Sequence, residues 1–181
     1  MRKINEIFYS LQGEGYYTGT PAIFIRFSGC NLKCSFCDTQ HEEGVLMSDE
    51  EIVKEVNKYP ATTVILTGGE PSLWIDSAFV DLLHSAGKYV CIETNGTCAL
   101  PNNIDWVTCS PKQGAKLKIT RMNELKLVYE GQDIEAYESL SAQYYFLQPC
   151  SCNNTTETVA CIMKHPQWRL SLQTHKLIDI R

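Results

Sequence analysis

The feature that most constrains the fold is a series of short apolar runs, rich in β-branched and aromatic residues, that recurs along the whole chain. Unbroken runs of about 4–8 residues are typical of strands that are buried on both faces, as in a parallel sheet. We expect each of these runs to form a strand. They cover residues 22–27, 63–67, 89–94, 106–109, 125–129, 144–147 and 168–172.

Helix signals lie between some of these runs. Ser48 and Glu51 match a capping box, and Met47 and Ile52 are placed as a hydrophobic staple for a helix that reaches about residue 59. A second helix is expected over about 73–86, and a third from about Thr155, capped by Thr155 or Thr156. The expected buried side chains are Ile52, Val53 and Val56 in the first helix, Phe79, Val80, Leu82 and Leu83 in the second, and Val159 and Ile162 in the third.

The order of strands and helices indicates an α/β barrel, but the chain is short for a closed one. A full eight-stranded barrel takes about 250 residues, whereas this chain has 181. The segments 95–105 and 110–124 are also too short or too polar for complete crossover helices. We therefore predict a partial, open TIM-like barrel of about six parallel strands with few helices. A single domain over residues 1–181 is expected.

The charge balance argues against some classes of partner. Sixteen Lys and Arg residues against 21 Asp and Glu give a net charge of −5, without a block of basic residues. This is no footprint for nucleic acid or an anionic membrane, so small molecules or proteins are the expected partners. Neither an export signal nor an apolar stretch of about 20 residues can be read. We expect a cytoplasmic protein whose nine cysteines meet a reducing environment.

Three cysteines lie close together: Cys30, Cys34 and Cys37, in a Cys-x3-Cys-x2-Cys spacing directly after the first apolar run. Three thiolates can hold three irons of a 4Fe-4S cluster and leave the fourth iron open. An open iron can bind a substrate or cofactor, whereas a cluster that only carries electrons is normally held by four cysteines. The other six are expected to be buried or incidental thiols: Cys91, Cys98, Cys109, Cys150, Cys152 and Cys161.

Two other uses of the three thiols remain open from the sequence. Together with His41, four residues after Cys37, they match a Cys3His zinc site. They also match a non-catalytic iron–sulfur electron carrier. Neither use accounts for the polar motifs that follow the predicted strands.

Polar motifs follow five of the predicted strands. In parallel α/β folds the loops at the carboxyl ends of the strands form the functional face, so we expect these motifs to converge on one rim. Gly68 and Gly69 lack a Cβ, which allows their backbone to approach a ligand closely. The motifs are Phe27-Ser-Gly-Cys30, Thr67-Gly-Gly-Glu-Pro71, Glu93-Thr-Asn-Gly96, Ser110-Pro-Lys112 and Gln148-Pro149.

The three-cysteine motif with Phe36 inside it, combined with the Gly-Gly-Glu-Pro motif, resembles the radical S-adenosylmethionine (SAM) enzymes. The resemblance implies that the open iron chelates the amino and carboxylate groups of SAM. One electron then splits a carbon–sulfur bond and yields a 5'-deoxyadenosyl radical that takes hydrogen from the substrate. It also implies a set of SAM-binding residues: Phe36, Asp38, Gly68, Gly69, Glu70, Asn95, Ser110, Pro111, Lys112 and Gln148.

Segments across nearly the whole chain resemble, more specifically, the 7-carboxy-7-deazaguanine synthase family. They are residues 10–15, 18–22, Arg26, 37–39 and 172–176. The resemblance implies conversion of 6-carboxy-5,6,7,8-tetrahydropterin into 7-carboxy-7-deazaguanine with loss of ammonia, a step toward queuosine. It further implies a magnesium ion on Thr39, a flavodoxin as electron donor and a homodimer.

The residues suit such a substrate. A pterin has alternating donors and acceptors on its aminopyrimidinone edge together with a carboxylate, which Gln12, Glu14 and the Arg26 guanidinium can bind. Arg26 lies in an otherwise apolar run and must have a partner; we expect it to act together with Glu14, with a structural ion pair as the alternative. The expected substrate-binding set is Leu11, Gln12, Gly13, Glu14, Arg26, Thr67, His175 and Arg181.

The carboxyl terminus has a further implied role. In the resembled family the terminal carboxylate contacts the substrate, and the chain often ends in Gly-Ile-Pro. Here it ends in Asp179-Ile180-Arg181, so a larger, charged residue carries the carboxylate. The nearest rival function is a small glycyl-radical-enzyme activase with the same cysteine spacing, which would need an open groove for a peptide loop.

Overall fold

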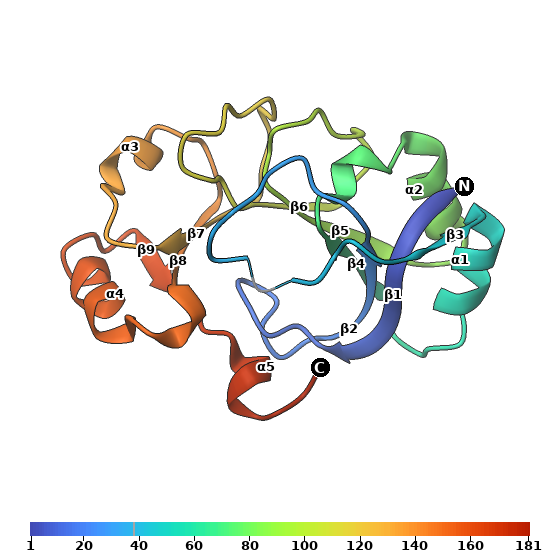
Figure 1. Cartoon of the computed structure of the whole chain (residues 1–181), viewed down its shortest axis with the longest axis horizontal. Helices are drawn as coiled ribbons and strands as arrows, with labels where there is room; N and C mark the ends of the chain where they lie inside the picture. The colour runs from blue at the N-terminus through green and yellow to red at the C-terminus, as the bar shows by residue number, and fades with distance from the viewer. Residues whose placement is uncertain (38) are drawn as a thin grey trace.

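The chain forms one curved, open sheet with helices at its two ends. The computed structural model describes residues 1–37 and 39–181. The sheet has nine strands in the order β3-β1-β2-β4-β5-β6-β7-β8-β9. In Figure 1, α1 and α2 flank one end of the sheet and α3 and α4 the other, while loops cover the middle strands. This is the partial barrel that the sequence predicts.

The strands from β2 to β9, without β3, pair in parallel. Each predicted run forms a strand, although the last ends at Leu170 rather than at residue 172. The parallel part of the sheet has seven strands, slightly more than the predicted number of about six. The strands are β2 Pro21–Phe27, β4 Thr63–Gly68, β5 Tyr89–Thr94, β6 Trp106–Cys109, β7 Glu124–Tyr129, β8 Tyr144–Pro149 and β9 Trp168–Leu170.

Two antiparallel strands complete the sheet. β1 (Arg2–Leu11) pairs with β2, with Glu6 opposite Arg26, and the short β3 (Val45–Met47) pairs with the start of β1. The sequence analysis missed both strands. β1 mixes buried and half-exposed residues, and Val45 and Leu46 of β3 are exposed, so neither forms an unbroken apolar run.

Five α-helices and two 3-10 turns occur in the described residues. Ser48 and Glu51 form the expected reciprocal capping box at the start of α1. The helices are α1 Asp49–Val56, α2 Ser77–Ser85, α3 Glu135–Glu138, α4 Thr155–Ile162 and α5 Thr174–Leu177, and the 3-10 turns are η1 Pro71–Leu73 and η2 Cys150–Cys152.

Two helix predictions were wrong in detail. The second helix begins at Ser77 with Asp76 as its N-cap, not at residue 73, because Pro71–Leu73 forms a separate 3-10 turn. Leu82 then points outward and is 40% exposed. The third helix has Asn154 at its N-cap, without a side-chain capping bond. Its predicted buried residue Val159 is 39% exposed, and its buried side chain is Thr158.

The two faces of the parallel sheet have different environments. The outer face packs against the helices in the main core, which includes Ile25, Leu66, Ile92 and Leu127. The inner face is apolar toward the amino ends of the strands, where Phe8, Ala22, Phe24, Ile65, Cys91 and Trp106 cluster. Tyr16 and Tyr144 stack on Trp106 with ring centres 4.8 and 5.9 Å away. These aromatic rings fill the barrel at that end.

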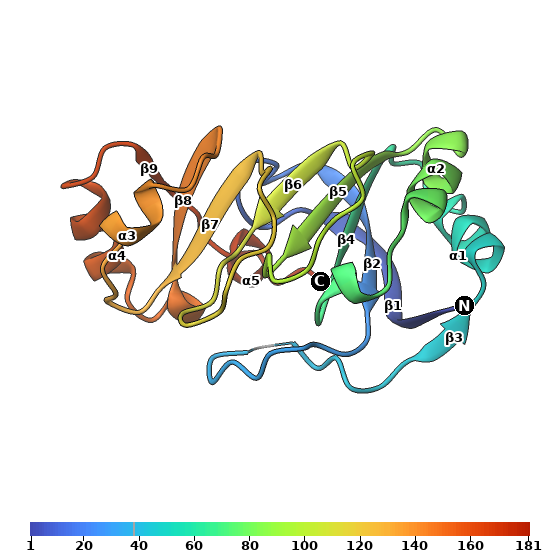
Figure 2. The ribbon, with the colours of Figure 1, turned by 90° about the horizontal axis from the view of Figure 1, so that it is seen from above.

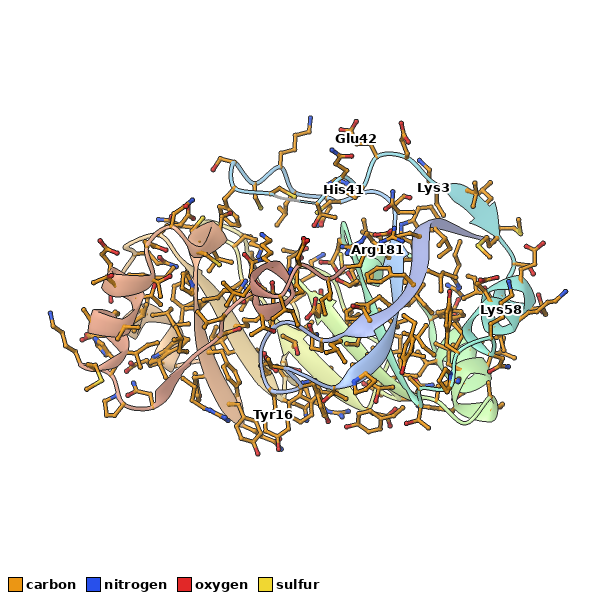
Figure 3. All side chains as sticks on the ribbon, turned by 90° about the horizontal axis from the view of Figure 1, so that it is seen from below. Lys3, Tyr16, His41, Glu42, Lys58 and Arg181 are labelled. Atoms are coloured by element: carbon orange, nitrogen blue, oxygen red, sulfur yellow. The ribbon has the colours of Figure 1, made fainter. Side chains whose placement is uncertain are left out.

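The carboxyl ends of the strands face a long loop, described over residues 28–37 and 39–44, which we call the cysteine loop. Figure 2 shows it crossing beside these strand ends. Figure 3 shows Tyr16 on the opposite side of the molecule from His41 and Glu42 of this loop. The cysteine loop therefore lies at the end of the barrel interior that the aromatic rings do not fill. Within residues 1–37 and 39–181, no helix is long and apolar enough to cross a membrane.

The burial of α2 gives a direct test of the corrected helix. Leu83 is fully buried, so Leu83→Ala should lower the free energy of unfolding by about 2–5 kcal/mol. Leu82→Ala is the matched control, because a half-exposed leucine should cost only about 0.5 kcal/mol. Urea unfolding followed by circular dichroism measures both, and equal losses would place Leu82 in the core.

Candidate active site

The glycine pair after β4 packs against the start of the cysteine loop. Gly69 N donates to Phe27 O at 3.1 Å, and Glu70 N donates to Gly29 O at 2.9 Å. A Cβ on Gly69 would lie 2.0 Å from Gly29 O, and one on Gly68 would lie 2.3 Å from Phe27 O. Contact between the two loops therefore requires both glycines. The predicted cluster loop and the predicted SAM motif lie together.

Glu70 fastens the next loop to this pair. Its buried carboxylate accepts hydrogen bonds from Thr94 Oγ1 and Asn95 N, both at 2.7 Å, and from Ser72 N at 3.0 Å. The Asn95 side chain donates to Asn31 Oδ1 of the cysteine loop at 3.0 Å. The loops after β2, β4 and β5 are thus held as one unit, and the Glu70 carboxylate has a structural role.

Ser110 and Lys112 extend the same rim. Ser110 N donates to Thr94 O at 2.8 Å, and Lys112 Nζ donates to Ser110 Oγ at 2.7 Å. Lys112 Nζ also lies 5.5 Å from the centre of the Phe36 ring. Burial lowers the pKa of Lys112, while the nearby Cys34 thiol opposes that shift. These predicted SAM residues therefore converge.

The other predicted SAM residues have separate surroundings. Gln148 is buried at the end of β8 and accepts a hydrogen bond from Ser171 Oγ at 2.9 Å. Pro111 is buried. Asp38 lies outside the described residues.

The three loop cysteines have the donor chemistry of a cluster site. Cys30 and Cys34 are half-buried and Cys37 is exposed. Cys37 N donates to Cys34 O at 3.2 Å, and Leu32 N donates to Cys30 Sγ at 3.4 Å. Burial raises the pKa of Cys30, and Glu70 and the other two thiols add to this. A bound cation reverses such a shift and stabilises the thiolates. Three thiols on one loop beside the glycine pair therefore fit a 4Fe-4S cluster.

His41 does not join these thiols. Its carbonyl accepts a hydrogen bond from Gly29 N at 2.7 Å, and its Nδ1 is buried without a hydrogen-bond partner among the described residues. Throughout residues 1–37 and 39–181, no three His, Cys, Asp or Glu side chains are grouped so that they could hold a metal ion. The Cys3His zinc arrangement is not formed. Thiolates on separate irons need not converge on one point.

The remaining cysteines lie apart from the cluster loop in the sequence. Cys91 and Cys109 are buried, as expected, and burial raises the pKa of Cys109 to about 12, so its thiol stays protonated at neutral pH. The other four are half-buried: Cys98, Cys150, Cys152 and Cys161.

Five polar side chains form a hydrogen-bonded cluster inside the barrel, which we call the interior polar network. Gln12 Nε2 donates to Glu93 Oε1 at 3.0 Å, and Thr67 Oγ1 donates to Glu93 Oε2 at 3.1 Å. Lys126 Nζ lies 2.6 Å from Glu14 Oε2 and 3.3 Å from Glu93 Oε1. The network unites three predicted substrate residues with two that were not predicted.

Burial and charge oppose each other in this network. Burial alone would raise the pKa of Glu14, but the Lys126 ammonium and hydrogen bonds from Lys126 and Gln173 outweigh it and hold this pKa below its usual value. Burial would lower the pKa of Lys126, but the neighbouring carboxylates reverse the shift and raise it. Burial raises the pKa of Glu124, whose Oε1 has no hydrogen-bond partner within the described chain.

Arg26 and Glu14 have different ion-pair partners, so their joint action on a substrate stays a prediction. Arg26 Nε lies 2.8 Å from Glu6 Oε1, because the antiparallel register places these two residues opposite each other. Glu14 lies beyond the end of β1, where Leu11 is half-buried, and reaches Lys126 of β7 instead. Arg26 therefore has the partner that a charge in an apolar strand requires, and this partner is Glu6.

His175 lies against the loop that joins β1 to β2. Thr174 N and Oγ1 both donate to Gly13 O, at 2.9 and 3.0 Å. A Cβ on Gly13 would lie 2.0 Å from His175 Nδ1, so only glycine allows this approach. The predicted residues Gly13 and His175 are therefore in contact.

Arg181 folds back onto the inner face of β1. Its carbonyl accepts a hydrogen bond from Ser10 Oγ at 2.6 Å, and its guanidinium bonds to Glu6 Oε2 and lies 5.0 Å from the centre of the Phe8 ring. Figure 3 shows Arg181 beside β1. Arg181 therefore contacts β1, the strand that pairs with β2 and places Glu6 opposite Arg26.

Sequence and structure comparisons agree with this geometry. Residues 24–124 match the Radical SAM superfamily. The chain is 80% identical to a 7-carboxy-7-deazaguanine synthase of Bacteroides thetaiotaomicron over 100% of both chains, and 41% identical to one of Nitratidesulfovibrio vulgaris over 98% of each. It also matches the crystal structure of QueE from Escherichia coli with 33% identity and a TM-score of 0.81, covering 94% of this chain and 93% of that one. The chain belongs to the 7-carboxy-7-deazaguanine synthase family.

This family membership makes the chain a radical SAM enzyme of 7-deazapurine biosynthesis, and the superfamily implies a 4Fe-4S cluster and SAM. The predicted site residues of this synthase family member did not include Lys126 and Gln173 of the barrel interior, and Glu93 was named only as the first residue of a rim motif. Glu93 and Lys126 interrupt apolar strands, as Arg26 does. The rule that a charged residue in a buried strand needs a partner would have found both.

The contact between the glycine pair and the cysteine loop predicts a strong effect of Gly69→Ala. The added Cβ meets backbone atoms that cannot move without shifting the loop, so unfolding free energy should fall by about 1–3 kcal/mol and bound iron after anaerobic reconstitution should drop. Gly131→Ala is the control for iron content, because its added Cβ meets nothing within 4 Å; its positive φ adds a strain cost that Gly69 does not have. Equal iron content in the two variants would contradict this role.

Proposed function

We propose that this chain, as a single domain over residues 1–181, converts 6-carboxy-5,6,7,8-tetrahydropterin into 7-carboxy-7-deazaguanine with loss of ammonia. The observation that carries the proposal is the interior polar network. It lies next to the rim, because Thr67 directly precedes the glycine pair and Glu93 is next to the last residue of β5. One core that runs from β1 to β9 supports the single domain.

The cysteine loop and the rim provide the cofactor site in this proposal. Cys30, Cys34 and Cys37 would hold the 4Fe-4S cluster, which supplies the electron that cleaves SAM. The joined loops would keep Gly68, Gly69 and Asn95 in place before SAM arrives. The full proposed set of SAM-binding residues is Phe36, Asp38, Gly68, Gly69, Glu70, Asn95, Ser110, Pro111, Lys112 and Gln148, of which Asp38 lies outside the described residues.

The interior polar network would bind the aminopyrimidinone edge of the pterin. Glu14 is an ionised acceptor for ring N–H donors, while Gln12 and Thr67 offer neutral groups. Leu11, Gly13 and His175 would form the adjacent wall. Pre-formed hydrogen bonds hold these side chains in position, so binding requires little rearrangement.

The Arg26 guanidinium would bind the carboxylate of the substrate. Its Nε bonds to Glu6, and the guanidinium presents further N–H donors for a second carboxylate. The terminal carboxylate of Arg181 would contact the substrate from the β1 side.

The remaining parts of the proposal concern a metal ion and partners. The Thr39 hydroxyl, two residues after Cys37, would ligate Mg²⁺, with substrate oxygens and water as the other ligands. A flavodoxin would supply electrons, two copies of the chain would form a homodimer, and the enzyme would act in the cytoplasm. Resemblance to the family supports these assignments.

An anaerobic assay tests the reaction and the substrate together. With a reconstituted cluster, dithionite, SAM, Mg²⁺ and 6-carboxytetrahydropterin, we expect 7-carboxy-7-deazaguanine in the mass spectrum. Deoxyadenosine without this product would overturn the proposed pterin pocket and favour a glycyl-radical activase. Cys34→Ala should abolish SAM cleavage, because the cluster loses one of three ligands. Retained cleavage in that variant would contradict the ligand assignment.

A carboxyl-terminal extension should lower turnover. Ser10 Oγ donates a hydrogen bond to the Arg181 O atom. A peptide fused after Arg181 removes the terminal carboxylate, and the added chain must pass beside Ser10. We expect kcat/KM to fall about tenfold or more, which corresponds to about 1.4 kcal/mol. The same tag at the amino terminus is the control. Unchanged kinetics in the carboxyl-terminal fusion would remove the terminal carboxylate from the site.

A further inference from the structure

Lys126 occupies a central place in the barrel interior. It projects from β7, is 5% exposed, and its ammonium lies between Glu14 of the β1–β2 loop and Glu93 of β5. It therefore joins segments that are 112 and 33 residues away in the sequence. A buried ammonium is retained only where paired charges compensate for the loss of water.

Each of the two carboxylates is also held by neutral donors. Gln173 Nε2 donates to Glu14 Oε1 at 2.9 Å, and Thr67 Oγ1 donates to Glu93 Oε2 at 3.1 Å. Glu93 Oε1 accepts from both Gln12 Nε2 and Lys126 Nζ, whereas Glu14 Oε1 is held by Gln173, Glu14 Oε2 by Lys126 and Glu93 Oε2 by Thr67. A carboxylate oxygen can accept more than one hydrogen bond, so these three oxygens can also accept from a ligand. Two carboxylates against one ammonium leave an excess of acceptors in the pocket.

We infer that Lys126 is a positioning residue for the substrate: its ammonium fixes the Glu14 and Glu93 side chains as a pair of acceptors, and this pair selects a ring edge rich in N–H donors. The chemical class is a 2-amino-4-oxopyrimidine edge, whose ring N–H and exocyclic amino group are adjacent donors. The inference rests on the proposed function, because it deepens the role of the same pocket.

Variants that remove or keep the positive charge of Lys126 should distinguish its role in positioning the carboxylates from a role in packing. Lys126→Met keeps the length of the side chain and removes the ammonium, whereas Lys126→Arg keeps a positive charge. Lys88→Met is a matched control, since Lys88 Nζ donates to the Ala61 carbonyl at 2.9 Å and the residue directly precedes β5, at the end of the strand away from the pocket.

The probe is 7-carboxy-7-deazaguanine, which has the same aminopyrimidinone edge as the proposed substrate, compared with its analogue that lacks the 2-amino group. Calorimetric titration of the cluster-loaded protein at pH 7.5 gives both dissociation constants. Lys126→Met should weaken binding of the amino probe by about tenfold or more and reduce the preference for it over the analogue. Lys126→Arg and Lys88→Met should stay within about threefold of the unsubstituted protein.

The pH dependence supplies a second readout. Without the ammonium, burial raises the pKa of Glu14, so in Lys126→Met binding of the amino probe should weaken as pH falls from 8 to 6 more steeply than in the unsubstituted protein. Glu93 of β5, Glu124 of β7 and His175 of α5 also face this pocket or act on Glu14, and they are present in both proteins. The difference between the two pH profiles of binding therefore measures the effect of the Lys126 ammonium.

The double variant Glu14→Gln/Lys126→Met covers the case in which the single variant fails to fold, since neutralising both partners removes the unpaired buried charge. It should fold, bind the amino probe weakly and lose the added pH dependence. Unchanged binding in Lys126→Met, or an equal loss for both probes, would overturn the inference. If the unsubstituted protein binds neither probe, the proposed function fails instead, which separates the two outcomes.

Discussion

The structure depends on the need to cover both faces of a parallel sheet. Helices cover the outer face near its two ends, and the inner face curves around the barrel interior, which side chains fill. Side chains alternate between faces with a period of two, so each strand supplies side chains to both the outer core and the barrel interior. In β2, Phe24 belongs to the aromatic filling and Arg26, two residues later, lies above it on the same face. A slip of one residue would move both to the outer core.

The same alternation separates the barrel interior into an apolar half and a polar half. Ile65 and Thr67 of β4 show the change within one strand, as do Cys91 and Glu93 of β5. Once carboxylates face a low-dielectric interior, they need a cation in place before any ligand binds. Lys126 provides it from the opposite part of the sheet. The electrostatics of the site therefore follow from strand register as much as from the rim loops.

The sequence predicts the parallel strands well because burial on both faces leaves unbroken apolar runs. It predicts β1 and β3 poorly because one face of β1 is partly exposed and β3 is short. The rim loops were also predictable, since each motif follows its strand directly. The partner of Glu14 was not, because Glu14 and Lys126 are 112 residues apart and only the three-dimensional register brings them together. Local patterns carry no information on such a pairing.

The open side of the barrel explains the arrangement at the chain terminus. β9 and the β3–β1 pair are at opposite ends of the sheet order, so no strand pairing closes the gap between them. The last residues reach across instead, from Thr174 on Gly13 to Arg181 on Ser10. Arg181 and Arg26 then share Glu6, one carboxylate oxygen each. The Arg181–Glu6 ion pair adds little stability by itself, because Arg181 is mostly exposed. The hydrogen bonds of Thr174 with Gly13 and of Ser10 with Arg181 therefore also hold the last residues across the gap.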